Sequence, residues 1–89
     1  MTSGSDVTRP GADVTIRYWA SARAAAGCDS ELFGGRRVGD VLEAAAAAHT
    51  GLAVVLAVST ILLDGRAVTA SQPLADGSTL EVLPPFAGG

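Results

Sequence analysis

Two short segments with alternating side chains, one near each end of the chain, constrain its fold more than any other feature. The first, residues 14–19, has the two-residue period of a β-strand, and its core-facing set is Val14, Ile16 and Tyr18. Trp19 then falls on the opposite face. The second, residues 79–83, has two inward and two outward side chains, Leu80 and Val82 against Glu81 and Leu83. If these strands are central neighbours, they pair in parallel and the intervening chain forms the crossover.

The helices are expected between these two strands. Residues 20–26 favour a short helix that Gly27 ends as a C-cap. The main helix is predicted over residues 38–49, where apolar residues recur at helical spacing and acidic residues occupy the first turns, as the helix dipole favours. Its N-cap is weak, because no Ser, Thr, Asp or Asn directly precedes Val38.

Glycines and turn residues divide the rest of the chain. Residues 29–33 are predicted as a short strand, antiparallel to the first, that Gly34-Gly35 breaks. Asp64-Gly65 is the strongest hairpin signal, flanked by strands over residues 60–63 and 66–68. Asp76-Gly77 gives a second turn.

Residues 52–59 have no clear period and fit either a buried irregular segment or a short helix. With one main helix across a mixed sheet, the predicted fold is α+β, of the ubiquitin-like β-grasp type.

The length and composition indicate a single small domain. Its 89 residues leave no room for a second core, and 48% of them are hydrophobic. Residues 1–12 are rich in Ser, Gly and Thr and are expected to be a flexible leader. Residues 13–83 form the predicted domain, and residues 84–89 an extended tail.

Charge and cysteine content exclude several classes of function. The net charge is −3 and the six basic residues are all arginine, without a basic stripe, so nucleic-acid binding is not expected. The single cysteine, Cys28, excludes an internal disulfide framework and a multi-cysteine metal site, and no metal or bound cofactor is expected. No signal peptide is expected, because the N-terminal residues lack a basic segment followed by an apolar one. No membrane span is expected either, because the longest mainly apolar run, residues 52–63, is too short to cross a bilayer. The predicted location is therefore cytoplasmic.

The last six residues, Pro84-Pro85-Phe86-Ala87-Gly88-Gly89, are the strongest functional signal. Proline cannot continue a strand ladder, and a Gly-Gly end fits a channel too narrow for other dipeptides. A terminal carboxylate reacts only after a partner activates it. A frayed end without function is the alternative.

The chain resembles the ubiquitin-like sulfur carrier proteins, and most closely the small subunit of molybdopterin synthase. The opening strand, the Val38-Gly-Asp-Val-Leu42 helix start, the turn at residues 73–77 and above all the Leu-Pro-Pro-x-Ala-Gly-Gly ending carry this resemblance. It implies that a ubiquitin-activating-like adenylyltransferase uses ATP to adenylate Gly89, and that a sulfur donor then converts it to a thiocarboxylate. It also implies that residues 85–88 (Pro85, Phe86, Ala87 and Gly88) insert into the large synthase subunit in a heterotetramer, where the sulfur builds the dithiolene of molybdopterin.

The resemblance also implies an apolar docking surface on the open face of the sheet, at Trp19, Ala67 and Leu83. Ala67 is smaller than the residue usual in its position. The carrier itself would be the non-catalytic, sulfur-donating subunit of the enzyme complex.

Two residues with reactive side chains have simpler interpretations. Cys28 has no His or base near it in the sequence and is interpreted as an incidental thiol. His49 is interpreted as a helix C-terminal residue favoured by the dipole.

Other functions remain open from the sequence. The chain could carry sulfur to cysteine or to the thiazole of thiamin, could modify target lysines through Gly89, or could be an interaction module with an idle tail.

Overall fold

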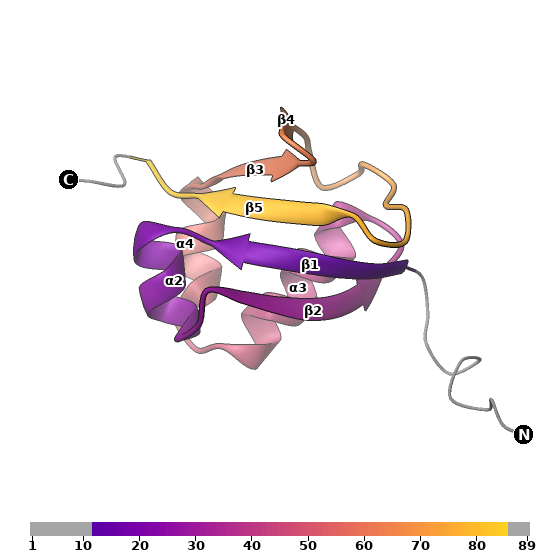
Figure 1. Cartoon of the computed structure of the whole chain (residues 1–89). Coiled ribbons are helices and arrows are strands. Elements are labelled where there is room, and N and C mark those ends of the chain that lie inside the picture. The colour runs from indigo at the N-terminus through magenta and orange to yellow at the C-terminus, as the bar shows by residue number, and fades with distance from the viewer. Residues whose placement is uncertain (1–11, 86–89) are drawn as a thin grey trace, which may run out of the picture.

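The computed structural model describes residues 12–85 and contains one five-stranded sheet with the strand order β2-β1-β5-β3-β4 (Figure 1). The elements in chain order are β1 (Ala12–Tyr18), α2 (Ala20–Ala26), β2 (Ser30–Gly35), α3 (Val38–Ala48), α4 (Leu52–Val58), β3 (Thr60–Leu63), β4 (Arg66–Ala67) and β5 (Thr79–Leu83).

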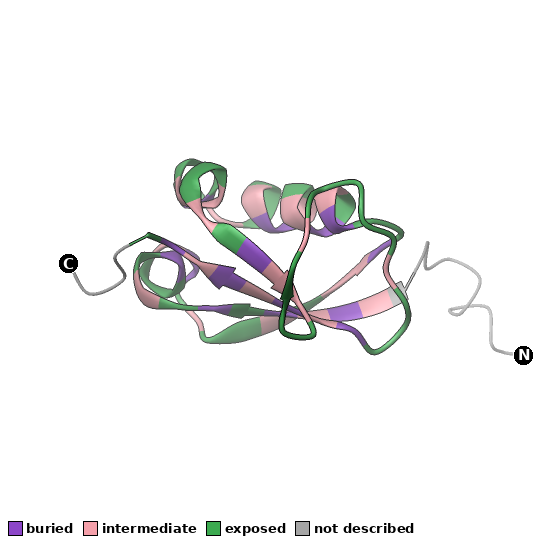
Figure 2. Ribbon diagram, turned by 90° about the horizontal axis from the view of Figure 1, so that it is seen from above, coloured by how far each residue is buried: buried purple, intermediate pink, exposed green. Residues whose placement is uncertain are grey.

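The first and last strands lie side by side at the centre of the sheet. β1 pairs with β5 in parallel, with Ile16 opposite Leu80 and Tyr18 opposite Val82, while β2 and β3 flank them in antiparallel pairing. Helices α3 and α4 cover one face of the sheet, and the other face is open (Figures 1 and 2). The predicted α+β β-grasp arrangement, with a parallel central pair and a crossover between, is confirmed.

The core forms where the helices meet the sheet. The predicted inward side chains of β1 and β5 are buried, and residues of α2, α3, α4 and β3 complete the cluster. Its largest fully buried members are Ile16, Leu52, Leu80, Val14, Val38, Val41 and Val82. Aliphatic side chains dominate because the described core has Tyr18 as its single fully enclosed aromatic residue.

The prediction that Gly34-Gly35 breaks the second strand is wrong. Both glycines stay in β2, where Gly34 pairs with Asp13 and Gly35 with Ala12. A Cβ on Gly35 would lie 2.8 Å from Cγ2 of Val41 on α3. The glycine therefore lets the helix pack directly on the strand rather than ending it.

Residues 52–58 form a helix, which decides between the two alternatives for this segment. Only Leu52 is buried, while Val54 and Val58 are 74% and 63% exposed. Leu52, Val55 and Leu56 face the core at helical spacing, but the opposite face of the helix is apolar as well, so no contrast between the two faces reveals the period.

The two turns and the start of α3 are built as their residue types suggest. Asp64 and Gly65 have φ of +47° and +90°, as a type I′ hairpin turn requires. Asp76 accepts a hydrogen bond from the Asp13 N–H at 2.8 Å, which ties the second turn to β1. The Asp40 carboxylate accepts the N–H of Arg37 at 3.0 Å and compensates for the absent N-cap side chain.

No helix within residues 12–85 has the length and apolar character needed to cross a membrane.

We expect Gly35→Ala to lower the free energy of unfolding by about 1–3 kcal/mol, because the new methyl group overlaps the buried Val41 side chain. Chemical denaturation measures this loss. Val41→Ala opens the space that the methyl group needs, so the double variant should lose less stability than the two single losses added together. Strict additivity would show that Gly35 does not set the approach of α3.

Candidate functional site

β5 delivers the chain end from the middle of the sheet. Its last residues are held on both sides, with Val82 opposite Tyr18 of β1 and Leu83 opposite Thr60 of β3. Pro84 is buried and Pro85 is exposed, so the chain has reached the surface by Pro85. Of the predicted tail residues, Phe86, Ala87, Gly88 and Gly89 lie outside the described residues.

Apolar side chains gather on the open face beside this exit. Leu62 of β3 pairs with Ala67 of β4, Leu83 of β5 shares their face, and Trp19 follows the β1 residue that pairs with Val82. We call Trp19, Leu62, Ala67 and Leu83 the open-face patch. Trp19 is 37% exposed, Ala67 is exposed, and the two leucines are half-buried.

The Trp19 indole is held along the sheet by polar neighbours. Its Nε1–H donates to a Glu81 carboxylate oxygen at 3.2 Å, and the Arg17 guanidinium carbon lies 5.1 Å from the ring centroid. Its backbone N–H donates to the Val82 carbonyl at 3.3 Å. Contacts of this kind limit the rotation of the ring, so the patch presents a preorganised apolar surface.

The docking surface predicted from the sequence contained Trp19, Ala67 and Leu83 but not Leu62. The signal that could have found it is the Asp64-Gly65 turn. A two-residue hairpin loop sets the strand register, and that register places Leu62 opposite Ala67 on the same face.

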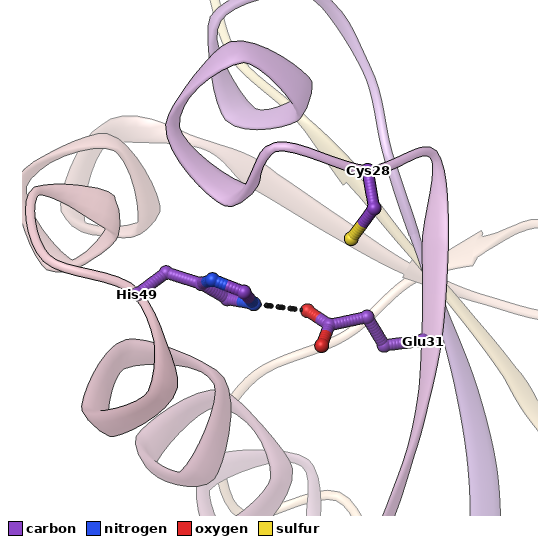
Figure 3. Close-up of side chains that lie close together, drawn as sticks. All are labelled: Cys28, Glu31 and His49. Atoms are coloured by element: carbon purple, nitrogen blue, oxygen red, sulfur yellow. Dashed lines mark hydrogen bonds and ion pairs between the residues drawn. The ribbon is translucent and has the colours of Figure 1, made fainter.

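A second group of side chains meets on the opposite, helix-covered side of the sheet. Cys28 precedes β2, Glu31 lies in β2, and His49 is the C-cap of α3. Their ligand atoms (Sγ, a carboxylate oxygen and a ring nitrogen) all lie within 4.8 Å of one another (Figure 3). Folding therefore places a histidine and a carboxylate that are distant in the sequence beside Cys28, whose interpretation as an incidental thiol rested on sequence distance alone.

Glu31 is the hub of this group, which we call the Cys28 cluster. One carboxylate oxygen, Oε2, accepts the Tyr18 hydroxyl at 2.9 Å and also contacts Nε2 of His49. Burial and the hydrogen bond to Glu31 raise the pKa of the Tyr18 hydroxyl, so Tyr18 remains a donor at neutral pH. Burial and the nearby Glu31 charge also raise the pKa of the Cys28 thiol. Cys28 is therefore a protonated thiol at neutral pH rather than an activated nucleophile.

Comparison with known proteins connects the fold to a family. A ThiS family model matches residues 16–89. No curated protein sequence matches the chain closely enough to count as a relative.

Several solved structures share the fold. A protein described as molybdopterin converting factor, subunit 1, from Pyrococcus furiosus is 29% identical with a TM-score of 0.77, over 85% of this chain and 100% of that chain. Small archaeal modifier protein 1 from Methanosarcina acetivorans is 25% identical with a TM-score of 0.80, over 88% and 97%. A complex of subunits 1 and 2 of molybdopterin-converting factor from Helicobacter pylori holds a chain that is 23% identical with a TM-score of 0.66, over 86% and 99%, which shows the fold alone.

These similarities place the chain among ubiquitin-fold sulfur carriers and small modifiers. Because the family match spans β1 from Ile16, the rest of the sheet, the open-face patch and the last residue of the sequence, the chain belongs to the ThiS family.

Proposed function

We propose that this protein carries sulfur as a C-terminal thiocarboxylate on Gly89 and serves as the small, non-catalytic subunit of molybdopterin synthase. The observation that carries the proposal is the family match through Gly89, on a chain whose final strand is the central β5. A strand fixed on both sides gives the tail a rigid base from which to reach into a partner.

The chemistry assigned to Gly89 proceeds in two balanced steps. An adenylyltransferase partner joins the Gly89 carboxylate to the α-phosphate of ATP and releases pyrophosphate. A sulfur donor then displaces AMP by breaking the acyl–phosphate bond and forming an acyl–sulfur bond. Removal of the donor's remaining bond to that sulfur, by reduction where the donor is a persulfide, leaves the thiocarboxylate. In this scheme the partners supply the catalytic groups and bind the ATP.

This chain's part is to present the tail and to dock. Ala87, Gly88 and Gly89 carry little or no side chain, so the backbone can enter a narrow channel. Pro85 fixes φ at the base of the tail. The open-face patch lies beside that base and would contact the partner that receives the tail.

The proposed partner is a large synthase subunit, in a heterotetramer of two small and two large subunits. Supporting this, the H. pylori structure with the same fold is a complex of subunits 1 and 2 of molybdopterin-converting factor. The P. furiosus structure, also described as subunit 1, is 29% identical and covered over its full length.

A second candidate function is protein modification, in which Gly89 forms an isopeptide bond with a target lysine. The similarity to small archaeal modifier protein 1 favours it. The same activated carboxylate serves both functions, so the tail chemistry alone does not separate them. Transfer of sulfur to cysteine or thiamin precursors is a third use of the same carrier.

We expect the C-terminal peptide to gain the mass of one oxygen-for-sulfur exchange when the full chain is incubated with ATP, a sulfur donor and its adenylyltransferase. Intact-protein and peptide mass spectrometry measure the exchange and locate it at Gly89. A variant that lacks Gly88-Gly89 should gain no sulfur and should keep its melting temperature, because the core lies within residues 14–82. Sulfur found elsewhere in the chain, or none at all, would contradict the proposal.

The receiving pathway can be tested in cells. We expect the gene to restore molybdoenzyme activity to a strain without its own small synthase subunit, and the variant without Gly88-Gly89 to fail. Rescue of a cysteine or thiamin auxotroph instead would assign the sulfur to another product. Isopeptide-linked Gly-Gly remnants on other proteins would favour the modifier function.

We expect Trp19→Ala or Leu83→Ala to weaken binding to the large subunit at least tenfold, a loss of about 1.4 kcal/mol or more, because both remove apolar area beside the tail. Isothermal titration calorimetry with the purified subunit measures the affinity.

Leu32→Ala is the matched control for these variants. Leu32 is 68% exposed and pairs with Thr15 on the same open face, but it lies on β2, the edge strand on the far side of β1 from β5. Its replacement should leave the affinity unchanged. An equal loss for Leu32→Ala, or no loss for the patch variants, would rule out the patch as the docking surface.

A further inference from the structure

We propose that Cys28, Glu31 and His49 form a binding site for one zinc ion. The three side chains come from the turn before β2, from β2 itself and from the end of α3, and they point toward one common space (Figure 3). The proposal is independent of sulfur transfer, because the cluster lies on the helix-covered side of the sheet, away from the open-face patch.

The spacing of the three ligand atoms suits a tetrahedral ion. Zinc bonds of 2.0–2.3 Å place neighbouring ligands about 3.3–3.6 Å apart. The Sγ, carboxylate oxygen and imidazole nitrogen already lie within 4.8 Å of one another. The His49 and Glu31 atoms, which are in direct contact, must move apart to admit an ion, while the widest pair must approach; rotamer adjustments of about an ångström suffice for both.

The types of ligand select the metal. A thiolate, an imidazole and a carboxylate together match zinc and similar borderline-soft ions, whereas magnesium and calcium prefer oxygen ligands alone. Each of the three residues is half-buried, so the site is neither a fully solvated surface group nor a closed core position. With three protein ligands, a water molecule completes the coordination.

A neighbouring residue orients one of the ligands by a hydrogen bond, as is usual at metal sites. The Tyr18 hydroxyl donates to Glu31 at 2.9 Å and directs the carboxylate toward His49. In the metal-free chain a proton joins Nε2 of His49 to the Glu31 oxygen. A metal ion would take the place of that proton between the same two atoms.

Charge and protons balance when zinc binds. The Cys28 thiol releases one proton to solvent as its sulfur bonds the metal, and the proton that Nε2 of His49 shares with Glu31 moves through solvent to Nδ1, which leaves Nε2 free to bind. The dication with one thiolate and one carboxylate then has a net charge of zero.

The test uses the full chain, first stripped of metal with a chelator and kept reduced. Addition of cobalt(II), a spectroscopic substitute for zinc, should produce a thiolate-to-metal charge-transfer absorption in the near ultraviolet and visible bands of a tetrahedral ion, saturating at one ion per chain. Zinc should abolish both. Competition with a chromophoric chelator then gives the zinc affinity, and zinc should also raise the melting temperature, because it binds the folded state.

The effects of the variants are simple to interpret, because the chain has one cysteine and one histidine and no second residue of either type can replace a removed ligand. Cys28→Ser should remove the charge-transfer absorption, and His49→Gln and Glu31→Gln should each weaken zinc binding at least a hundredfold. Tyr18→Phe, which removes only the supporting hydroxyl, should weaken it about 10–100-fold. Glu43→Gln is the matched control, since it removes the same charge from an exposed position on α3 and should change nothing.

Circular dichroism checks that each variant folds. If a variant of a ligand residue fails to fold, Tyr18→Phe still tests the site, because it leaves all three ligands in place. Absence of the charge-transfer absorption in the parent chain would overturn the proposal. So would zinc binding that Cys28→Ser and His49→Gln leave unchanged, which would indicate adventitious binding to surface carboxylates.

Discussion

The parallel pairing of β1 with β5 is the interaction on which the rest of the structure depends. Parallel neighbours run in one direction, so both strands end at the same side of the sheet, and Trp19 necessarily stands beside the exit of the tail. The same pairing requires a crossover, which α3 and α4 help to form while they cover one face. One pairing thus determines where β5 ends, which surface lies beside that strand end and which face remains open.

Local sequence patterns predicted this arrangement well because each pattern corresponds to one physical rule. Alternation in β1 and β5 sets the faces, and Asp64-Gly65 sets a turn whose positive φ values few other residue pairs accept. The prediction for Gly34-Gly35 was wrong because glycine can either end a strand or allow another element to pack closely on it. Only the position of Val41 in the fold shows that the second role applies here. The segment at α4 could be assigned to neither alternative because both faces of the helix are apolar, which leaves no contrast between buried and exposed positions.

The sheet also separates two kinds of chemistry. On the open face, apolar area beside a rigid strand end suits docking and release, since the polar contacts of Trp19 are solvent-exposed. On the covered side, the His49 and Glu31 side chains are only 20% and 24% exposed and contact each other, and Cys28 lies beside them. Under the proposed function, in which the chain leaves one partner for the next, this separation lets contacts on the open face change while the Cys28 cluster stays intact.

The Cys28 cluster could not be predicted from sequence spacing, yet element lengths explain it. β2 and α3 run in opposite directions and touch at one end through Gly35 and Val41. From Gly35 back to Glu31 is four strand residues, about 13 Å, and from Val41 on to His49 is eight helical residues, about 12 Å. The two paths match, so contact at the glycine end brings the histidine to the carboxylate at the other. The glycine that lets the helix approach the strand is therefore also what positions His49 beside Glu31.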